Sequence, residues 1–504
     1  MNTTNRVLLN TVSQYVRTGL NVILSLYSTK IILEILGSSD YGLYSVIAGV
    51  VAMLSFVSNT FVISTQRYLS FSHGLKDKEI LTKVFGNSFI IHVVIGVVLL
   101  ILLLGLTNPV VCNYLEIPNN RLEAAKTVYI CVAAMVALTF ITSPFRAIFI
   151  ARENIVYISI VDVIDGILKV VFALLLSHIS YDKLETYALL LTLISLFNLF
   201  SFAIYALLKY EECRFPKFSD IDKSYIRKLT GFAGWTLYST GCVVVRTQGI
   251  ALLINRVFGV ILNASYGIAQ QISSALVNVA QAIANAMSPQ IIKAEGAGDR
   301  ERMMYLASIE CKYGYFMLAM VAIPLMFEMS FVLKVWLHDV PESAAMFCNA
   351  VIIAALCDTL TGGLGIAFQA IGKIKKYSLV FGTIKLITIP LAYVLVTLCH
   401  EPYYVMFAFI FNEFISSIVR IILLRQTVNM NVTKFLKSTI LPSFSVTIVV
   451  VGVCYLINNT INWAYNIILL FPISIISVIV VALMTMDKTE KDVLNKIIRR
   501  IYVK

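Results

Sequence analysis

The chain has 504 residues, of which 59% are hydrophobic and only 13% are charged. A soluble globular protein is about 25% charged, so this composition excludes a water-soluble enzyme and predicts a membrane protein. The 40 Lys and Arg residues outnumber the 28 Asp and Glu residues and give a formal net charge of +12. What this excess means depends on where the basic residues lie along the chain.

The apolar residues gather into blocks of about 20 residues, the length at which a helix crosses the hydrocarbon core of a bilayer. Helices are the expected spanning element, because backbone groups inside a bilayer need internal hydrogen-bond partners. The sequence predicts an all-α polytopic membrane protein with fourteen transmembrane helices. Their approximate limits are 10–35, 41–65, 86–106, 125–148, 156–177, 186–209, 229–255, 261–288, 305–327, 344–369, 378–399, 403–424, 439–457 and 464–486.

The basic residues indicate which side of the membrane each loop occupies. With the N-terminus in the cytoplasm, 28 of the 40 Lys and Arg residues lie in cytoplasmic segments and five lie on the opposite side. This asymmetry is a strong positive-inside signal, and an even number of spans puts both termini in the cytoplasm. The distribution explains the net charge without a nucleic-acid partner.

Enzyme and cofactor signatures are missing from the sequence. There is no Gly-x-x-x-x-Gly-Lys-[Ser/Thr] loop for ATP hydrolysis. The nine cysteines and five histidines show no metal-ligand spacing. The connecting loops are too short to hold a catalytic domain, so we expect no enzymatic activity, no metal and no cofactor. Arg17 inside the first span argues against a removed signal peptide.

A weak internal repeat divides the chain. ILGSSDYGLYSVIAGV (35–50) follows the first span, and VFGVILNASYGIAQQI (257–272) follows the seventh. Their Tyr-Gly pairs lie at the same point of the span pattern, which predicts two six-helix lobes in a parallel pseudo-two-fold repeat. The expected domains are an N-terminal lobe (1–212), a basic cytoplasmic linker (213–228), a C-terminal lobe (229–425), two additional transmembrane helices (438–486) and a basic amphipathic cytoplasmic tail (487–504).

Polar side chains recur every three or four residues along the first and eighth spans. A polar face at membrane depth is expected to meet protein or water rather than lipid. We interpret the two faces as the lining of a central hydrophilic cavity between the lobes; the alternative is that they bind helices together by hydrogen bonds. The substrate-contact candidates are Arg17, Asn21, Arg246, Gln270, Asn278, Gln281 and Asn285.

Other charges fall inside the predicted spans. Three groups have the spacing that lets opposite charges on one helix face neutralise each other, so we expect structural pairs among them. Asp358 has no basic neighbour within its own span and is a candidate for proton or ion coupling, as are Glu310 and His92. For Asp358, a partner from another helix is the alternative. The expected structural pairs involve Asp162, Asp165 and Lys169; Glu413 and Arg420; and Lys30 and Glu34.

Three stretches carry a family resemblance: LGSSDYGLY (36–44), the segment 258–302, and VWLHDVPESAAMF (335–347). They resemble the Wzx-type polysaccharide flippases of the multidrug/oligosaccharidyl-lipid/polysaccharide exporter superfamily, and the similarity covers essentially the whole chain. In that family a cavity between two lobes is lined largely by the first, second, seventh and eighth helices.

The resemblance implies a flippase without enzymatic activity. It would move an undecaprenyl-diphosphate-linked oligosaccharide from the inner to the outer leaflet of the bacterial cytoplasmic membrane by alternating access, for O-antigen, capsule or another surface polysaccharide. The implied partners are this lipid-linked substrate, membrane lipids, and the polysaccharide polymerase and chain-length machinery.

The expected chemistry fits a diphosphate, because Arg presents N–H donors in a fork that matches phosphate oxygens. Arg17 and Arg246 occupy equivalent spans, so we expect them to approach the diphosphate from opposite sides. Two alternatives stay open. An ion-coupled small-molecule or multidrug exporter of the same superfamily would favour acidic groups in the cavity, and a membrane glycan polymerase or ligase would need a sizeable outer loop.

Overall fold

The computed structural model of the chain describes residues 3–52, 55–114, 117–216, 221–337, 340–341, 343–460 and 467–492. Throughout these residues the regular elements are helices, as the sequence predicts. The chain forms two compact units. Unit 1 comprises residues 1–237 and 296–298, and unit 2 comprises residues 238–295 and 299–504.

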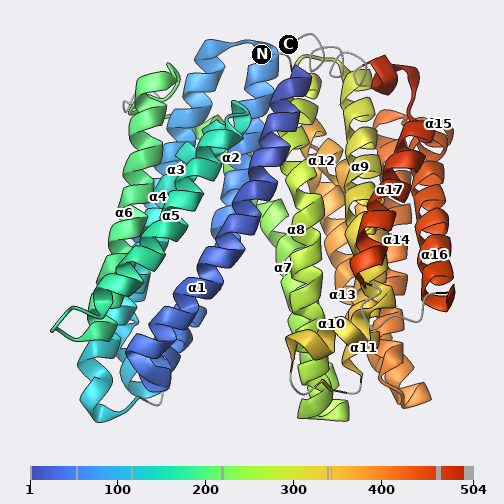
Figure 1. The fold of residues 1–504 in the computed structure, drawn as a ribbon. Coiled ribbons are helices and arrows are strands. Elements are labelled where there is room, and N and C mark those ends of the chain that lie inside the picture. The colour runs from blue at the N-terminus through green and yellow to red at the C-terminus, as the bar shows by residue number, and fades with distance from the viewer. Residues whose placement is uncertain are drawn as a thin grey trace, which may run out of the picture. The chain divides into compact units, whose positions relative to one another are not determined.

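Unit 1 is a bundle of long helices (Figure 1) in which α4 packs against α2, α3 and α6, while α1 packs against α5. Its core includes the buried rings of Phe85, Phe145, Phe149 and Phe202. The helices are α1 (Thr3–Ala52), α2 (Ser55–Leu75), α3 (Lys78–Gly105), a π-helix (Pro109–Tyr114), a 3-10 turn (Asn119–Arg121), α4 (Leu122–Ala151), α5 (Ile155–Leu176) and α6 (Lys183–Lys209), with the first part of α7 (Lys223–Phe258).

Unit 2 contains the rest of α7 and a second bundle. Helix α14 packs against α11 and α13, and the last two long helices, α16 and α17, pack against each other and against α9. The helices are α8 (Val260–Gly296), α9 (Arg300–Phe327), α10 (Met329–Trp336), α11 (Ala344–Thr359), α12 (Gly362–Ile371), α13 (Ile374–Cys399), α14 (Tyr403–Val428), α15 (Val432–Phe435), a π-helix (Leu436–Ile440), α16 (Leu441–Thr460) and α17 (Ile467–Thr485).

Local sequence explains where several helices begin and bend. Asp77 and Asp182 precede α3 and α6, and each accepts hydrogen bonds from two backbone N–H groups of the first turn. Inside α1, Gly37 has φ 74° and ψ 169°, which interrupts the helical path at a residue without a Cβ. The predicted second span, 41–65, is therefore divided between the end of α1 and the start of α2.

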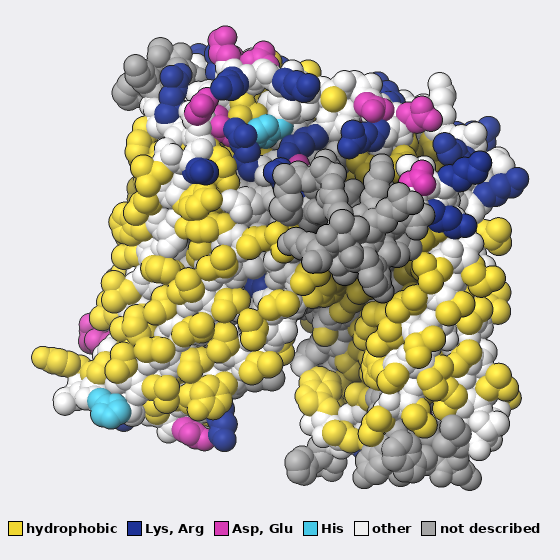
Figure 2. Space-filling model, turned by 45° about the horizontal axis from the view of Figure 1, so that its top comes forward, with side chains coloured by type: hydrophobic (Ala, Val, Ile, Leu, Met, Phe, Trp, Pro, Cys, Tyr) yellow, Lys and Arg dark blue, Asp and Glu magenta, His cyan; other side chains and the backbone are white. Residues whose placement is uncertain are grey.

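The helices carry the surface expected of a membrane protein. In the described part of the chain, ten helices are long and apolar enough to cross a bilayer, and the bent pair α11–α12 makes eleven. Helices α2, α5 and α8 have 21, 22 and 37 residues, which is long enough to cross, but they are not among these helices; α5 is strongly apolar and carries three charged residues, Asp162, Asp165 and Lys169. The number fourteen stays a prediction. Figure 2 shows hydrophobic side chains along the flanks of the helices and charged ones gathered towards their ends.

The predicted tenth span, 344–369, is not one continuous helix. It is broken into α11 and α12, which meet at an angle of 42°. A Cβ at Gly363 would lie 2.3 Å from the Ala307 carbonyl oxygen and 2.3 Å from Glu310 Oε2, so only glycine permits this close approach to α9. The glycine-rich run that begins at Gly362 is the sequence signal for this break.

Candidate functional site

Three charged side chains from three helices meet inside unit 1. Arg17 of α1 donates from Nη1 to Asp162 Oδ2 of α5 at 2.8 Å. Arg146 of α4 donates from Nη1 and Nη2 to the two oxygens of the same carboxylate, at 3.0 and 2.7 Å. The planar guanidinium of Arg146 thus binds Asp162 in a bidentate manner. We call Arg17, Arg146 and Asp162 the unit-1 triad.

The triad lies within the predicted first, fourth and fifth spans, 10–35, 125–148 and 156–177. Near the start of α1, Arg6 is 3.8 Å from Glu153, and near its far end Asp40 pairs with Arg121. Arg17 comes eleven residues after Arg6, which is about 16 Å along a helix, and it is well short of Asp40. Charged groups at such a depth are rare and usually mark a substrate or ion pathway.

The triad has an excess of positive charge. Two guanidinium groups share one carboxylate, which leaves a formal charge of +1. The side chains of Arg17, Asp162 and Arg146 are 20%, 19% and 37% exposed. Within the described residues Arg17 makes a single hydrogen bond, to Asp162, so its remaining N–H donors are available to another acceptor. This arrangement can accept a further anion.

The charged residues along α5 do not all pair with one another. Lys169 lies 2.7 Å from Asp165, whose other oxygen accepts a hydrogen bond from Asn198 at 2.7 Å. The expected pairing along α5 is confirmed for Asp165 and Lys169. Asp162 instead pairs with Arg17 and Arg146 on other helices, because residues at i and i+7 are about 10 Å apart along a helix and Lys169 reaches the nearer acid. The other predicted pair in unit 1, Lys30 and Glu34, is exposed, and its charged atoms are 4.0 Å apart.

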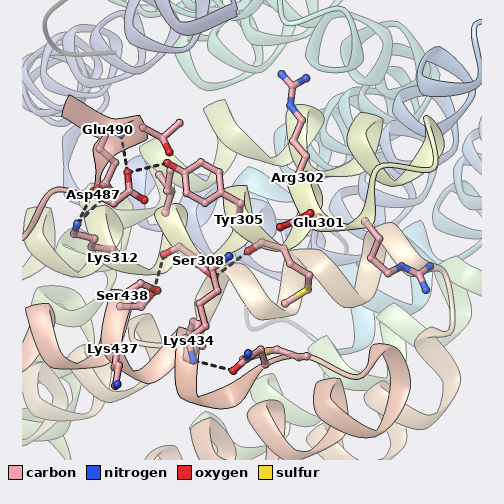
Figure 3. A pocket seen from close by; sticks show the side chains of 18 of the residues that line it. Glu301, Arg302, Tyr305, Ser308, Lys312, Lys434, Lys437, Ser438, Asp487 and Glu490 are labelled. Carbon is pink, nitrogen blue, oxygen red and sulfur yellow. Dashed lines mark hydrogen bonds and ion pairs between the residues drawn. The ribbon is translucent and has the colours of Figure 1, made fainter. Parts of the chain in front are cut away.

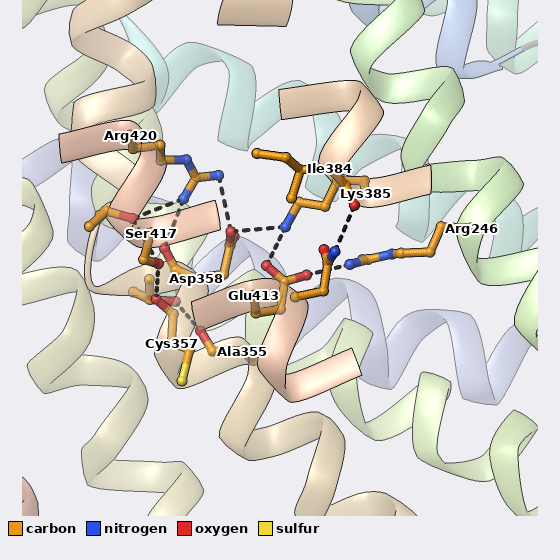
Figure 4. Close-up of polar contacts among 12 residues, drawn as sticks. Arg246, Ala355, Cys357, Asp358, Ile384, Lys385, Glu413, Ser417 and Arg420 are labelled. Atoms are coloured by element: carbon orange, nitrogen blue, oxygen red, sulfur yellow. Dashed lines mark hydrogen bonds and ion pairs between the residues drawn. The ribbon is translucent and has the colours of Figure 1, made fainter. Parts of the chain in front are cut away.

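Five charged side chains of alternating sign are linked across four helices of unit 2 (Figure 4). Arg246 of α7 lies 2.5 Å from Glu413 of α14, and Lys385 of α13 donates to the other oxygen of Glu413. Lys385 Nζ is also 3.6 Å from Asp358 Oδ1 of α11, and Arg420 Nη2 of α14 is 3.0 Å from that oxygen. We call these five residues the unit-2 network.

The unit-2 network is mostly buried. The side chains of Arg246, Lys385, Glu413 and Arg420 are between 2% and 7% exposed, whereas that of Asp358 is 44% exposed. The Arg246 guanidinium lies 4.2 Å from the centre of the Phe409 ring. Arg246 is therefore enclosed by Glu413 and an aromatic ring. The two arginines that the sequence treats as equivalent have different surroundings.

One prediction about unit-2 charges is corrected, and one alternative is confirmed. Glu413 and Arg420, expected to pair along α14, instead pair with residues on other helices, because their seven-residue separation is about 10 Å along the axis. Asp358, which lacks a basic neighbour in its own span, is paired with Lys385 and Arg420. Its partners come from α13 and α14, which spacing along one helix cannot reveal.

Helix α14 also holds the break between α11 and α12. Arg420 Nη1 donates to the Asp358 carbonyl oxygen at 3.1 Å and to Thr361 Oγ1 at 3.2 Å. Ser417 Oγ donates to the Cys357 carbonyl oxygen at 2.7 Å. These bonds supply additional donors to carbonyl groups at the end of α11, where a helix provides few of its own. The network and the bend thus form one connected structure.

The remaining coupling candidates are buried. Glu310 is 4% exposed on α9, and within the described residues its Oε2 has no hydrogen-bond partner. His92 is 1% exposed on α3; its Nδ1 donates to the Ser88 carbonyl oxygen at 2.7 Å, and its ring packs edge-on against Phe61. His92 has the surroundings of a packing residue, while Glu310 lies against the α11–α12 break.

The polar face of α8 is largely open. Asn278 and Gln281 are exposed, whereas Gln270 and Asn285 are half-buried, and Gln281 donates to Asn285 at 3.1 Å. Asn21 lies one turn beyond Arg17 on α1, and its buried Oδ1 accepts no hydrogen bond from the described residues. Exposed amides in a helix of this length can bind hydroxyl groups.

A further charged cluster ties helix ends together in unit 1, outside the spans. Arg121 binds Asp40 and lies 2.5 Å from Asp182, the residue that precedes α6. Partial burial acts to raise the pKa of Asp182, but hydrogen bonds from the Glu185 backbone N–H and from Arg121 outweigh it and hold the pKa below its ordinary value. This cluster has the character of a structural clamp.

Sequence reasoning missed two members of these clusters. Arg146 counts among the cytoplasmic topology charges in the sequence pattern, yet it lies on α4 and completes the triad. Lys385 is recognisable as an embedded charge, but its central position in the network is not. The available signal was the fourth predicted span itself, which includes position 146.

Comparison with known protein families gives one match. A family model described as polysaccharide biosynthesis protein matches residues 4–295. No curated protein matches the chain.

Solved structures share the fold. A crystal structure of a MATE mutant has a TM-score of 0.75 and 12% identity, covering 85% of this chain and 97% of its own. An outward-facing multidrug resistance MATE family transporter of the MOP superfamily has a TM-score of 0.73 and 13% identity, with 85% and 96% covered. A MOP superfamily transporter from Pyrococcus furiosus, whose binding pocket is described as reversed in polarity, has a TM-score of 0.71 and 14% identity over the same shares. At these identities the likeness shows a transporter fold.

Proposed function

Since the chain belongs to the polysaccharide biosynthesis protein family, we propose that it is a flippase for a lipid-linked oligosaccharide. The substrate is an oligosaccharide joined through a diphosphate to undecaprenol. The protein moves it from the inner to the outer leaflet of the bacterial cytoplasmic membrane by alternating access, with both termini in the cytoplasm. The outer product then supplies a polysaccharide polymerase.

The observation that carries this proposal is the positive excess of the unit-1 triad. Arg17 and Arg146 share one carboxylate within the predicted spans, and both guanidinium groups are partly exposed. A diphosphate offers several anionic oxygens, and charge-assisted bonds from Arg to phosphate are among the strongest hydrogen bonds in proteins. In this mechanism Asp162 holds the two arginines until the diphosphate binds beside it.

The sugars require different chemistry. Asn278 and Gln281 on α8 are exposed, and Asn21 on α1 carries a buried amide oxygen without a donor in the described part of the chain. Amide groups donate to and accept from hydroxyls without a strong preference for one sugar. Within unit 1 we assign the diphosphate to the triad and the adjoining sugar to Asn21, which lies one turn from Arg17 on the same helix.

Translocation needs no nucleotide hydrolysis. Moving about two negative charges outward across about 100 mV, inside negative, releases roughly 4–5 kcal/mol. Asp358 and Glu310 are the acidic groups beside the α11–α12 break, and counter-movement of a proton or cation would use them.

The alternative function is export of small cationic molecules. Such a substrate requires excess acid at the site, whereas the triad has excess base. A polymerase or ligase is less consistent with the family match and the transporter fold. The triad therefore favours an anionic substrate.

The test is to locate the lipid-linked oligosaccharide in cells that lack the protein. We expect it to accumulate in the inner leaflet and to be inaccessible to a glycosidase added from outside. Accumulation in the outer leaflet would instead indicate a polymerase and would falsify the proposal.

Complementation then addresses the triad. The wild-type chain and Lys169→Ala, which removes a basic residue already paired within α5, are expected to restore export. Arg17→Ala and Arg146→Ala are expected to reach the membrane at normal levels and fail to restore it. If both arginine variants restored export fully, the triad would not be the diphosphate site.

A further inference from the structure

A pocket of about 1160 Å³ opens at the end of unit 2 where α9 begins and α14 ends (Figure 3). Its walls are the first turns of α9, the segment from α14 through α15 and the following π-helix, and the residues after α17. The pocket thus lies at the junction between the core of unit 2 and its last two long helices. Neither the triad nor the unit-2 network contributes to it.

Two basic side chains line one wall of this pocket, and a third lies on its far side and points away from them (Figure 3). Lys434 of α15 and Lys437 of the π-helix are three residues apart, and Arg302 belongs to the first turn of α9. All three are exposed, and none of their charged groups is paired with the described residues. Exposed, unpaired cations at a helix end are positioned to bind an anion.

The acidic groups of the pocket have different surroundings, and one of them is in an ion pair. The buried Lys312 lies 2.9 Å from Glu490 and donates to the Thr485 carbonyl oxygen. Asp487 accepts from the Glu490 backbone N–H at 2.7 Å and from Tyr305 at 3.4 Å. Asp299 accepts from the Arg302 backbone N–H at 3.0 Å. A fourth acidic residue, Glu301, is exposed beside Arg302 in the first turn of α9. Lys434 and Lys437 belong to other elements, the α15 helix and the π-helix that follows it, and they carry the positive charge that can meet an anion.

An apolar surface continues from the basic wall. Leu436 is 43% exposed beside Lys437, and Leu441, Phe444 and Ile448 of α16 are 63%, 51% and 70% exposed. A charged pocket that leads directly onto an exposed apolar helix face matches a molecule with an anionic head and hydrocarbon chains. A free phosphate would contact only the basic side chains and would leave the apolar surface uncovered.

We infer that this pocket binds the headgroup of an anionic phospholipid. The phosphate lies against Lys434 and Lys437, and the acyl chains run along the exposed face of α16. The segments 293–302 and 425–437 are predicted to be cytoplasmic, where anionic lipids attract basic side chains at the membrane surface. The bound lipid joins α9 to the last two long helices, beside the Lys312–Glu490 pair.

The test uses the purified full-length protein in detergent, with phosphatidylglycerol as the probe. We expect native mass spectrometry to detect a retained phosphatidylglycerol molecule and the thermal unfolding midpoint to rise when this lipid is added. The double variant Lys434→Ala/Lys437→Ala should bind it roughly 30-fold more weakly, at about 1 kcal/mol for each lysine. The charge-preserving variant Lys434→Arg/Lys437→Arg should bind the lipid about as tightly as the wild-type chain does.

Matched controls separate the site from general basicity and from other ligands. Lys373→Ala/Lys376→Ala removes two exposed lysines elsewhere in unit 2 and should leave lipid binding unchanged. Phosphatidylcholine should bind weakly, and inorganic phosphate alone should not raise the unfolding midpoint. Equal stabilisation by phosphatidylcholine or by inorganic phosphate, or unchanged binding in the Lys434→Ala/Lys437→Ala variant, would overturn the inference.

Discussion

The unit-1 triad and the unit-2 network both contain an arginine paired with an acid from another helix, but the two arginines differ in their exposure. In each unit an arginine on the first helix of the six-helix set, Arg17 or Arg246, binds an acid from a later helix. The Arg17 side chain is 20% exposed and its acid is shared with Arg146, whereas the Arg246 side chain is 7% exposed and binds Glu413.

Burial distinguishes the two clusters, whereas formal charge does not. The network contains three basic and two acidic residues, and the triad contains two basic and one acidic residue, so each has one excess positive charge. The charged groups of the network are enclosed among helices, except that of Asp358, while those of the triad are partly exposed. We therefore expect Arg17 and Arg246 to have different roles despite their equivalent places in the sequence. Unit 1 offers a group for binding, and unit 2 uses its charges to hold helices together.

The largest expected effect is the loss of a network acid. Glu413→Gln would leave Arg246 and Lys385 buried without their shared carboxylate. Breaking a buried ion pair from one side costs about 3–5 kcal/mol, so we expect a steep loss of folded protein, measured by size-exclusion chromatography and thermal unfolding. Glu34→Gln, which removes an exposed acid, should behave like the wild-type chain. If Glu413→Gln were as stable as Glu34→Gln, the structural role of the network would be refuted.

The next effect concerns binding. Arg17→Ala should weaken binding of a short-chain polyprenyl diphosphate on the order of tenfold to a hundredfold, the range of a lost hydrogen bond to a charged group. Its thermal unfolding should change little, because the group is partly exposed. Lys169→Ala is the matched control and should bind normally. Equal affinity in the two variants would contradict the proposal that Arg17, unlike Lys169, contributes to diphosphate binding.

A smaller and opposite effect is expected at Asp162. Asp162→Asn removes the carboxylate that competes with the diphosphate for Arg17 and Arg146, so binding should tighten by a few-fold. The unfolding free energy should fall, but by less than in Glu413→Gln, because the triad side chains are more exposed than those of Arg246, Lys385 and Glu413. Weaker diphosphate binding in this variant would indicate that Asp162 positions the arginines rather than competing for them.

The smallest effect is a pH dependence at the helix ends of unit 1. The pKa of Asp182 is lower in the folded protein than its ordinary value, so its stabilising contribution is fully present above that ordinary value, about 3.9. This contribution is lost as the pH falls through the folded pKa. Asp182→Asn should therefore lower the unfolding midpoint slightly at neutral pH and remove part of the acid destabilisation. If the unfolding midpoint of Asp182→Asn fell with decreasing pH just as it does in the wild-type chain, Asp182 would not stabilise the helix ends of unit 1.

Most of the helices could be predicted from the sequence, because a segment that crosses the bilayer must be apolar over about 20 residues. Blocks of apolar residues correspond to helices such as α6 and α13, whose bounds lie within a few residues of the predicted limits. The break between α11 and α12 was not predicted, although Gly362 and Gly363 mark it. There, packing of Gly363 against α9 decides the path of the chain.

The charge clusters were less accessible, because spacing along a helix reveals only partners on the same helix. It identifies Asp165 and Lys169 as neighbours, but it cannot reveal that Asp162 faces Arg17 and Arg146. The contacts depend on which helices pack together and how each is rotated, and single-sequence periodicity does not encode either property.

Translocation by the purified protein in lipid vesicles tests the central claim most directly. A fluorescent undecaprenyl-diphosphate-linked oligosaccharide would be placed in one leaflet and its arrival in the other measured with a membrane-impermeant quencher. We predict that the wild-type chain and Lys169→Ala translocate it at similar rates, and that Arg17→Ala and Arg146→Ala are slower by about tenfold or more. Equal rates in all four proteins, or no translocation by the wild-type chain, would contradict the account.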